Sequence, residues 1–185
     1  MKTAEVISKT KWNIDPMHSQ VDFKIKHLMF TNVRGSFRDY SASIYMDEHD
    51  FSDAEIEVTI NPASVNTGDE KRDGHLKSID FFDVENFREI KFIGGSVEKS
   101  SDGRFKLNGD LTMKGITNPI QLDVEFGGMM KDPWGNEKAA FSVTGKINRK
   151  DWGLNWNAAL EAGGVLVSEE VWINCELQLA RQSQV

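Results

Sequence analysis

Histidine is the side chain best suited to bind a metal or to transfer a proton near neutral pH, and this chain has four. They are His18, His27, His49 and His75, and no two lie four residues apart, the spacing that places two ligands on one face of a helix. On one continuous strand His18 and His27 would point to opposite faces, because their separation is an odd number of residues. The spacing therefore predicts no metal site, and it favours histidines with polar or surface roles.

The sequence also lacks the motifs of nucleophilic catalysis and of phosphate binding. Gly94-Gly95-Ser96 comes nearest to Gly-x-Ser-x-Gly, but it lacks the final glycine and lies in an expected strand. Neither a Walker pattern nor Gly-x-Gly-x-x-Gly occurs. Cys175 is the single cysteine, so no intramolecular disulfide can form, and we expect it to be a small buried hydrophobic residue. We therefore predict no catalytic residue, no metal and no cofactor.

Charge and hydropathy limit the partners of the chain. Its 185 residues include 22 Lys and Arg against 29 Asp and Glu, and the formal net charge of −7 argues against nucleic acid and disfavours an electrostatic membrane anchor. The longest apolar run, 162–167, is far shorter than the ~20 residues that span a bilayer. Residues 1–11 contain no apolar core of a signal peptide. We expect a cytoplasmic protein, or a periplasmic one if a leader was removed.

The dominant pattern along the chain is the alternation of apolar and polar residues, which predicts strands with one buried and one solvent-exposed face. Six such stretches are clear: 21–26, 54–60, 105–111, 121–126, 141–147 and 171–179. Two weaker strands are expected at 36–46 and 90–97, which makes about eight. Turn residues at 101–103, 115–119 and 133–136 predict hairpins, and hence a meander over about 90–147. The fold class is therefore all-β and antiparallel, either a sandwich or a closed barrel.

Two irregular segments interrupt this pattern. The long connection around 64–90 begins with a polar stretch, 69–78, that predicts a short helix, and continues with aromatic residues that must bury against something. An apolar flap across the open end of a barrel would bury them, which favours the barrel over the sandwich. The segment around 150–165 contains Trp152 and Trp156 and a possible short helix over 158–162 that Gly163 would end. No linker is visible, so we expect one domain over 1–185 with a flexible N-terminus at 1–10.

The aromatic residues, 11 Phe, 5 Trp and 2 Tyr, allow two interpretations. Most lie at inward strand positions or in the two irregular segments. They could form an ordinary packed core, or they could line an apolar pocket for an elongated ligand. Alternation alone does not decide between the two.

A series of motifs resembles the YceI-like family of polyisoprenoid- and lipid-binding proteins. The series, in the order of the family, is 12–29 (WNIDPMHSQVDFKIKHLM), 33–37 (VRGSF), 63–68 (ASVNTG), 72–78 (RDGHLKS), 80–84 (DFFDV), 90–92 (IKF), 109–117 (GDLTMKGIT) and 148–154 (NRKDWGL). The resemblance extends from about residue 11 to 179, and Phe87-Arg88-Glu89 departs from it where the family often has proline after the phenylalanine. It implies an eight-stranded, lipocalin-like barrel whose lumen holds a polyprenyl pyrophosphate, a quinone or a fatty-acid derivative.

On this basis the inward strand residues are expected to line the lumen and contact the lipid: Phe23, Ile25, Phe37, Ile56, Val58, Phe105, Leu107, Phe141, Val143 and Ile173. Phe81, Phe82 and Trp152 are expected in the flap. Four residues in the matched motifs are expected either to meet a polar head group or to pin the long connection by hydrogen bonds: His18, His27, Arg72 and His75.

Three functions remain open at this point. The first is non-catalytic binding, transport or sequestration of an amphiphilic lipid. The second is an enzyme that acts on a bound lipid with His18 or His75 as general acid or base. The third is a stress-related structural or interaction domain with a filled core. Trp172, on the wet face of its strand, hints at a homodimer contact.

Overall fold

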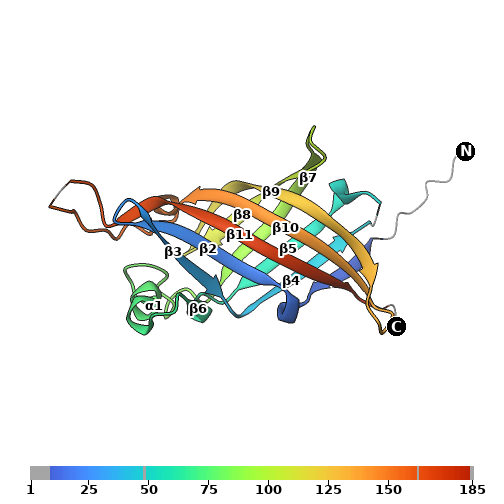
Figure 1. The fold of residues 1–185 in the computed structure, drawn as a ribbon, viewed down its shortest axis with the longest axis horizontal. Coiled ribbons are helices and arrows are strands. Elements are labelled where there is room, and N and C mark those ends of the chain that lie inside the picture. The colour runs from blue at the N-terminus through green and yellow to red at the C-terminus, as the bar shows by residue number, and fades with distance from the viewer. Residues whose placement is uncertain (1–8, 48, 162, 184–185) are drawn as a thin grey trace, which may run out of the picture.

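The computed structural model describes residues 9–47, 49–161 and 163–183, most of which belong to long antiparallel strands (Figure 1). The strands are β1 (Thr10–Ile14), β2 (Gln20–His27), β3 (Thr31–Phe37), β4 (Tyr40–Met46), β5 (Glu55–Ile60), β6 (Val65–Asn66), β7 (Ile90–Lys99), β8 (Phe105–Met113), β9 (Ile116–Lys131), β10 (Glu137–Asn148) and β11 (Val167–Arg181). One α-helix, α1 (Glu70–Lys77), and four short 3-10 helices connect them: η1 (Pro16–His18), η2 (Phe51–Asp53), η3 (Pro62–Ser64) and η4 (Arg149–Trp152).

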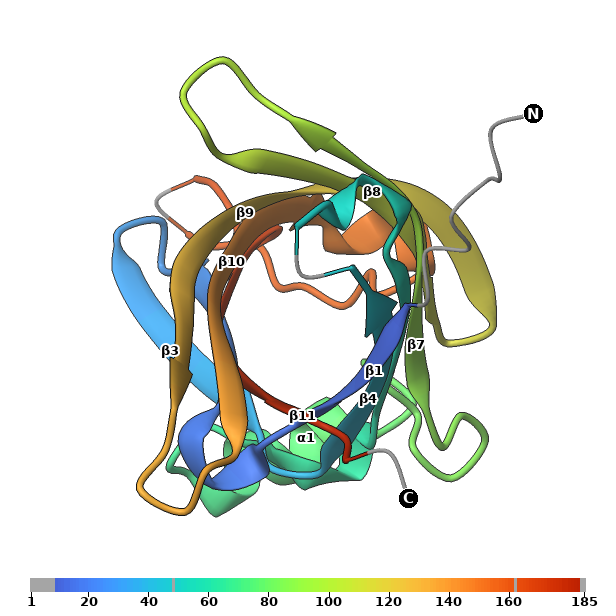
Figure 2. The same cartoon turned by 90° about the vertical axis from the view of Figure 1, so that its right-hand side faces the viewer.

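The strands close into a barrel of eight. The order β1-β4-β5-β7-β8-β9-β10-β11 is completed by pairing between β1 and β11, and Figure 2 looks along the ring that results. β2 continues β1 beyond η1 and takes its place beside β11, while β3 leads into β4. The predicted all-β, eight-stranded antiparallel barrel is therefore confirmed, and closure leaves these strands without the exposed edges of an open sheet.

Two breaks in the strands reset which side chains face inward. Ile14 and Val21 both line the interior although their separation is odd, which a continuous strand does not allow. Between them Pro16 opens η1, and the Asp15 carboxylate accepts the Met17 backbone N–H at 3.1 Å. Phe37 and Ala42 show the same change of phase. The prediction of one strand over 36–46 was therefore wrong, because the chain bends at 38–39 and forms β3 and β4.

The predicted turns at 101–103 and 133–136 connect β7 to β8 and β9 to β10, which confirms the meander. The turn predicted at 115–119 is shorter. Lys114 and Gly115 make it alone, with φ of 49° and 74°, and β9 begins at Ile116. Pro119, which has no N–H to donate, lies in the part of β9 that pairs with β8 alone, because β10 pairs with β9 only from Asp123 onward.

The helix predicted within 69–78 is confirmed as α1, and the Asp69 carboxylate caps it by accepting the Arg72 backbone N–H at 2.8 Å. The short helix predicted over 158–162 is wrong for its described residues, and Ala162 lies outside them. The chain turns back instead: Ala159 pairs with Val165, and Gly163 and Gly164 have φ of 87° and 88°. Of the expected flexible N-terminus at 1–10, residues 1–8 lie outside the described residues, and Thr10 already belongs to β1.

The two ends of the barrel differ. α1, the β2–β3 hairpin and the 153–166 loop project from one end, called here the α1 end (Figure 1). The β9–β10 hairpin, η2, the start of β1 and the end of β11 lie at the other, called here the termini end (Figure 1). No helix among the described ranges is long and apolar enough to cross a membrane.

Candidate ligand-binding site

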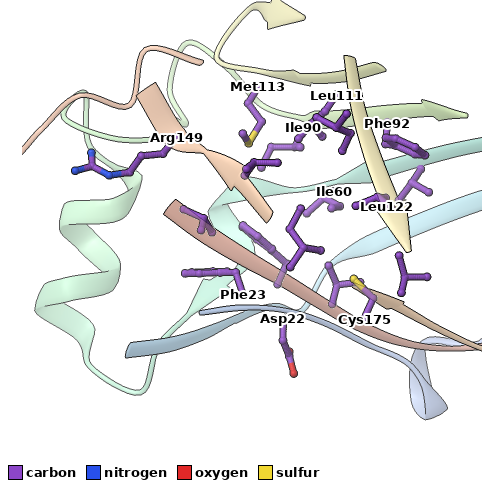
Figure 3. A pocket seen from close by; sticks show the side chains of 18 of the residues that line it. Asp22, Phe23, Ile60, Ile90, Phe92, Leu111, Met113, Leu122, Arg149 and Cys175 are labelled. Atoms are coloured by element: carbon purple, nitrogen blue, oxygen red, sulfur yellow. The ribbon is translucent and has the colours of Figure 1, made fainter. Parts of the chain in front are cut away.

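The barrel encloses a cavity of about 600 Å³ whose wall is almost entirely apolar. All ten residues predicted to face the lumen line it: Phe23, Ile25, Phe37, Ile56, Val58, Phe105, Leu107, Phe141, Val143 and Ile173. Their contact with a ligand remains a prediction. Figure 3 shows further wall residues that cross the interior from several strands, among them Ile60, Ile90 and Leu122. The lumen is therefore hollow, which contradicts the filled core of the third hypothesis.

On the β2–β3 side of the wall, a glycine makes room for a large aromatic ring. Phe23 lies across Gly35, the residue opposite it on β3, and a Cβ at that position would come within 2.3 Å of the phenyl ring. Phe37 continues this aromatic surface, with its ring centroid 5.6 Å from that of Phe23 and 5.7 Å from that of Phe82. Glycine at position 35 thus gives Phe23 the space to lie flat against the wall.

At the termini end, aromatic side chains pack together. Phe51 of η2 lies in edge contact with Phe105, Phe126 and Phe141, at centroid distances of 5.6, 5.1 and 5.5 Å. Phe51 and Phe141 also pack against a cluster of buried residues: Trp12, Ile44, Met46, Ala139 and Leu179. Sequence reasoning did not identify Phe51, because it lies outside the alternating strands.

At the α1 end, His75, Phe81 and Trp156 form a cluster of rings, called here the mouth cluster, that lines the cavity. The His75 ring meets Trp156 edge-on at 4.6 Å and Phe81 at 5.1 Å. Its Nε2 lies 2.8 Å from the Asp80 carboxylate, which fixes the orientation of the imidazole. Phe81 and Phe82 both line the cavity, and their role as a flap stays a prediction.

Trp152 does not belong to this flap, contrary to the prediction. It is buried at 2% exposure, it does not line the cavity, and its indole N–H donates to the Leu111 carbonyl at 2.8 Å. Trp156 contacts the cavity in its place. Gly153, with φ of 74°, turns the chain after η4, so the two tryptophans are not on one regular element.

Polar side chains reach the cavity chiefly at the α1 end. Besides His75, the lining there includes His27, Thr67, Lys71 and Arg72, of which sequence reasoning missed Thr67 and Lys71. Arg72 donates from Nε and Nη2 to the hydroxyl and carbonyl of Thr67, at 2.7 and 2.8 Å. The Thr67 hydroxyl in turn donates to the Asp73 carboxylate at 2.6 Å. This chain of hydrogen bonds holds the guanidinium at the cavity edge.

Arg149 also borders the cavity at this end, but its role is structural (Figure 3). It is 3% exposed and donates to the carbonyls of Ser168, Leu154 and Val167. Burial lowers the pKa of its guanidinium, while the nearby Glu169 carboxylate opposes that shift. These hydrogen bonds hold the start of the 153–166 loop and the start of β11 together.

His18 lies apart from the cavity, so the structure does not bring it together with the other three predicted head-group residues. Its Nδ1 lies 3.0 Å from the Asp15 carboxylate, and its side chain is 65% exposed. Burial would raise the pKa of Asp15, but the side-chain hydrogen bonds from His18 and Lys138 and the Met17 backbone N–H together lower it. His18 therefore supports the bend between β1 and β2.

Two further residues complete the description of the wall. Cys175 is buried, as predicted, and it pairs with Val21 of β2; burial raises the pKa of its thiol to about 12. Asp22 belongs to the same strand as Phe23, yet its carboxylate points away from the cavity (Figure 3). The middle of the lumen therefore presents a neutral surface.

Comparisons with known proteins agree with this geometry. The profile described as the YceI-like domain matches residues 12–179. A UPF0312 protein of Staphylococcus aureus (strain MSSA476) is 45% identical over 163 residues, which cover 88% of this chain and 92% of that protein. The crystal structure of a YCEI protein of Campylobacter jejuni is 36% identical with a TM-score of 0.73, and the match covers 87% of this chain and 91% of that one. A polyisoprenoid binding domain from Saccharophagus degradans, 15% identical, shares the fold with a TM-score of 0.66 over 92% of this chain and 98% of that one.

Proposed function

The chain belongs to the YceI-like domain family, and from this membership and the shape of its lumen we propose that it binds one elongated amphiphilic lipid, such as a polyisoprenoid or a fatty-acid derivative, without transforming it. The observation that carries the proposal is the apolar cavity of about 600 Å³, a size typical of small-molecule sites. The Saccharophagus degradans domain of the same fold is described as polyisoprenoid binding, which supports this choice of ligand class.

The apolar wall would supply most of the affinity. Each methylene moved from water into the lumen contributes roughly 0.8 kcal/mol of gross transfer free energy. Ligands of this size retain about 0.3 kcal/mol per heavy atom once ordering costs are subtracted. A chain that runs from the mouth cluster towards Phe51 would therefore bind tightly without any specific polar contact.

The head group would lie at the α1 end, because the polar lining residues are concentrated there. Lys71 and Arg72 carry positive charge at that edge, and His27 and His75 are able to donate hydrogen bonds. A phosphate, pyrophosphate or carboxylate would gain charge-assisted hydrogen bonds at this place, whereas a quinone would gain weaker neutral ones. We therefore propose an anionic head group in preference to a quinone.

Organic extraction of the purified protein followed by mass spectrometry tests this function. We expect an isoprenoid or acyl species in near-stoichiometric amount, and protein stripped of it should bind an added polyprenyl phosphate or long fatty acid. Recovery of no such species, together with no binding of either compound to the stripped protein, would refute the proposal.

The pair of His75 and Asp80 favours one second candidate, an enzyme acting on the bound lipid. The imidazole and carboxylate are 2.8 Å apart at the cavity mouth, a geometry that would suit a general base. This hypothesis predicts chemical conversion of the bound lipid that is lost in His75→Ala while binding persists. Non-catalytic binding predicts that the lipid is recovered unchanged from the wild type and from His75→Ala.

A further inference from the structure

The hairpin formed by β2 and β3 has a charge opposite to that of the chain as a whole. Residues 20–37 contain three basic residues and one acidic residue, Asp22, in a chain with a formal net charge of −7. The three basic residues are Lys24, Lys26 and Arg34. The overall charge disfavours an anionic surface as a partner, but this hairpin is a local exception.

The tip of the same hairpin is apolar and exposed. Leu28, Met29 and Phe30 are 37%, 53% and 77% exposed, although burial of such side chains is favourable. Leu28 and Met29 also have φ of 53° and 70°, a region that asparagine or glycine enters at less cost. Strained, exposed, apolar residues are a poor solution for folding alone, and such outliers gather at functional places.

This tip stands at the mouth of the cavity. His27, the last residue of β2, lines the cavity, and so does Leu166 at the end of the neighbouring loop. The Leu28 backbone N–H donates to the Leu166 carbonyl at 2.8 Å, and the Met29 side chain packs beside Gly164. The hairpin and the 153–166 loop therefore project together at the α1 end (Figure 1).

Behind the tip, a row of cations flanks an exposed tryptophan. Across β10, β11, β2 and β3 the residues in register are Lys146, Trp172, Lys24 and Arg34. The ammonium groups of Lys146 and Lys24 lie 5.2 and 5.5 Å from the Trp172 ring centroid. Lys24 stands directly opposite Arg34, and like charges in that position destabilise a sheet. The row is about 10 Å from the end of β2, because three residues at ~3.3 Å each separate Lys24 from His27.

We propose that this surface, an apolar tip (Leu28, Met29 and Phe30) with a band of Lys24, Lys26, Arg34 and Trp172 behind it, docks on the surface of an anionic lipid bilayer. The tip would enter the boundary between head groups and acyl chains, while the cations and the indole lie at the level of the phosphates. Docking in this orientation turns the cavity mouth towards the bilayer. The reason for docking, transfer of a lipid into the lumen, rests on the proposed function, whereas vesicle binding itself does not.

The β9–β10 hairpin also exposes apolar residues, so their exposure alone does not identify the β2–β3 hairpin as the docking surface. The β9–β10 hairpin at the termini end exposes Met130 at 74% and Trp134 at 83%. Its charged residues near the tip are Lys131, Asp132, Glu137 and Lys138, two of each sign, so it offers no excess charge to an anionic surface. Charge complementarity therefore assigns the docking surface to the β2–β3 hairpin, and the β9–β10 hairpin supplies a matched control.

Co-sedimentation with vesicles tests the proposal. Vesicles of phosphatidylcholine alone are compared with vesicles that also contain phosphatidylglycerol, with the wild-type protein and three double variants. These are Met29→Ser with Phe30→Ser, Lys24→Gln with Arg34→Gln, and the control Met130→Ser with Trp134→Ser, each checked for an unchanged thermal unfolding curve.

We expect the wild type to bind the anionic vesicles, with an affinity that falls as salt is raised. Each basic residue near such a surface is worth about a fivefold change in partition, so the lysine and arginine variant should bind about 25-fold more weakly. The tip variant should also bind weakly, and the control should match the wild type. Absence of binding to anionic vesicles would overturn the proposal, as would equal loss in the control. A dimer that dissociates in the tip variant, without vesicle binding, would assign the surface to a second copy and overturn it too.

Discussion

Replacing Val143 with tryptophan tests whether the lumen is free to take a ligand chain. Val143 lies in β10 between Val124 of β9 and Cys175 of β11, and its side chain lines the cavity. In a filled core the larger ring would destabilise the fold by roughly 1–3 kcal/mol. In a cavity of about 600 Å³ the indole has room, and we expect the free energy of unfolding to change by less than about 1 kcal/mol.

The same substitution should weaken lipid binding strongly. It adds about seven heavy atoms to the wall, and a ligand chain that loses as many contacts, at about 0.3 kcal/mol each, binds about 2 kcal/mol more weakly. This corresponds to an affinity about 30-fold lower. Thr144, the next residue, is exposed, so Thr144→Trp adds the same ring outside the barrel and should leave the affinity unchanged.

Displacement of a fluorescent fatty acid, measured beside denaturant unfolding of both variants, gives the two quantities. We expect Val143→Trp to lose affinity and keep its stability, and Thr144→Trp to keep both. A loss of several kcal/mol of stability in Val143→Trp would show that the interior has no room. An unchanged affinity in Val143→Trp would show that the ligand does not occupy this part of the lumen.

Four further predictions concern the mouth and the wall. Arg72→Gln should weaken binding of a polyprenyl phosphate by roughly 1–3 kcal/mol but leave a polyprenyl alcohol unaffected, as titration of both ligands would reveal; equal losses would contradict a head group at this edge. Asp80→Asn removes the carboxylate that orients His75, so the mouth cluster should obstruct the exit of the ligand less. Ligand release measured by stopped flow should therefore quicken at nearly constant stability. An unchanged release rate would argue against a role of the mouth cluster in retaining the ligand. The Cys175 thiol, with its pKa raised to about 12 by burial, should resist alkylation at pH 8 in the folded protein, and rapid modification would contradict its burial. The thiol of the unfolded chain ionises near its ordinary pKa of 9.0, whereas the folded one ionises only near 12, so the free energy of unfolding should fall as pH rises between these values. Cys175→Ala should make this decrease with pH shallower. An equal slope in both proteins would contradict the raised pKa of the thiol.

The architecture could be predicted from the sequence because alternation reports directly which residues face inward. Strands such as β5 and β8 have one apolar and one polar face over their whole length, and all ten predicted lumen residues line the cavity. Alternation did not locate the two bends, at Pro16 and at 38–39, where the inward-facing positions shift by one residue. Because the bend at 38–39 was missed, β3 and β4 were predicted as a single weak strand.

The candidate site could be predicted less well at its two ends, where no periodic pattern exists. Trp152 and Trp156 look alike in the sequence, and only the left-handed turn at Gly153 separates a buried structural tryptophan from one at the cavity. Phe51 lies on a 3-10 helix of three residues, too short to have a period. His18 falls in a matched motif, but its partner Asp15 is local, and the pair supports a bend.

A crystal structure of the protein loaded with a long polyprenyl phosphate tests the central claim most directly. We predict continuous density that begins beside Arg72 and His75, follows the lumen past Val143, and ends near Phe51. An empty lumen with the lipid bound on the outer surface of the barrel would contradict the account, as would a barrel whose side chains collapse to fill the interior.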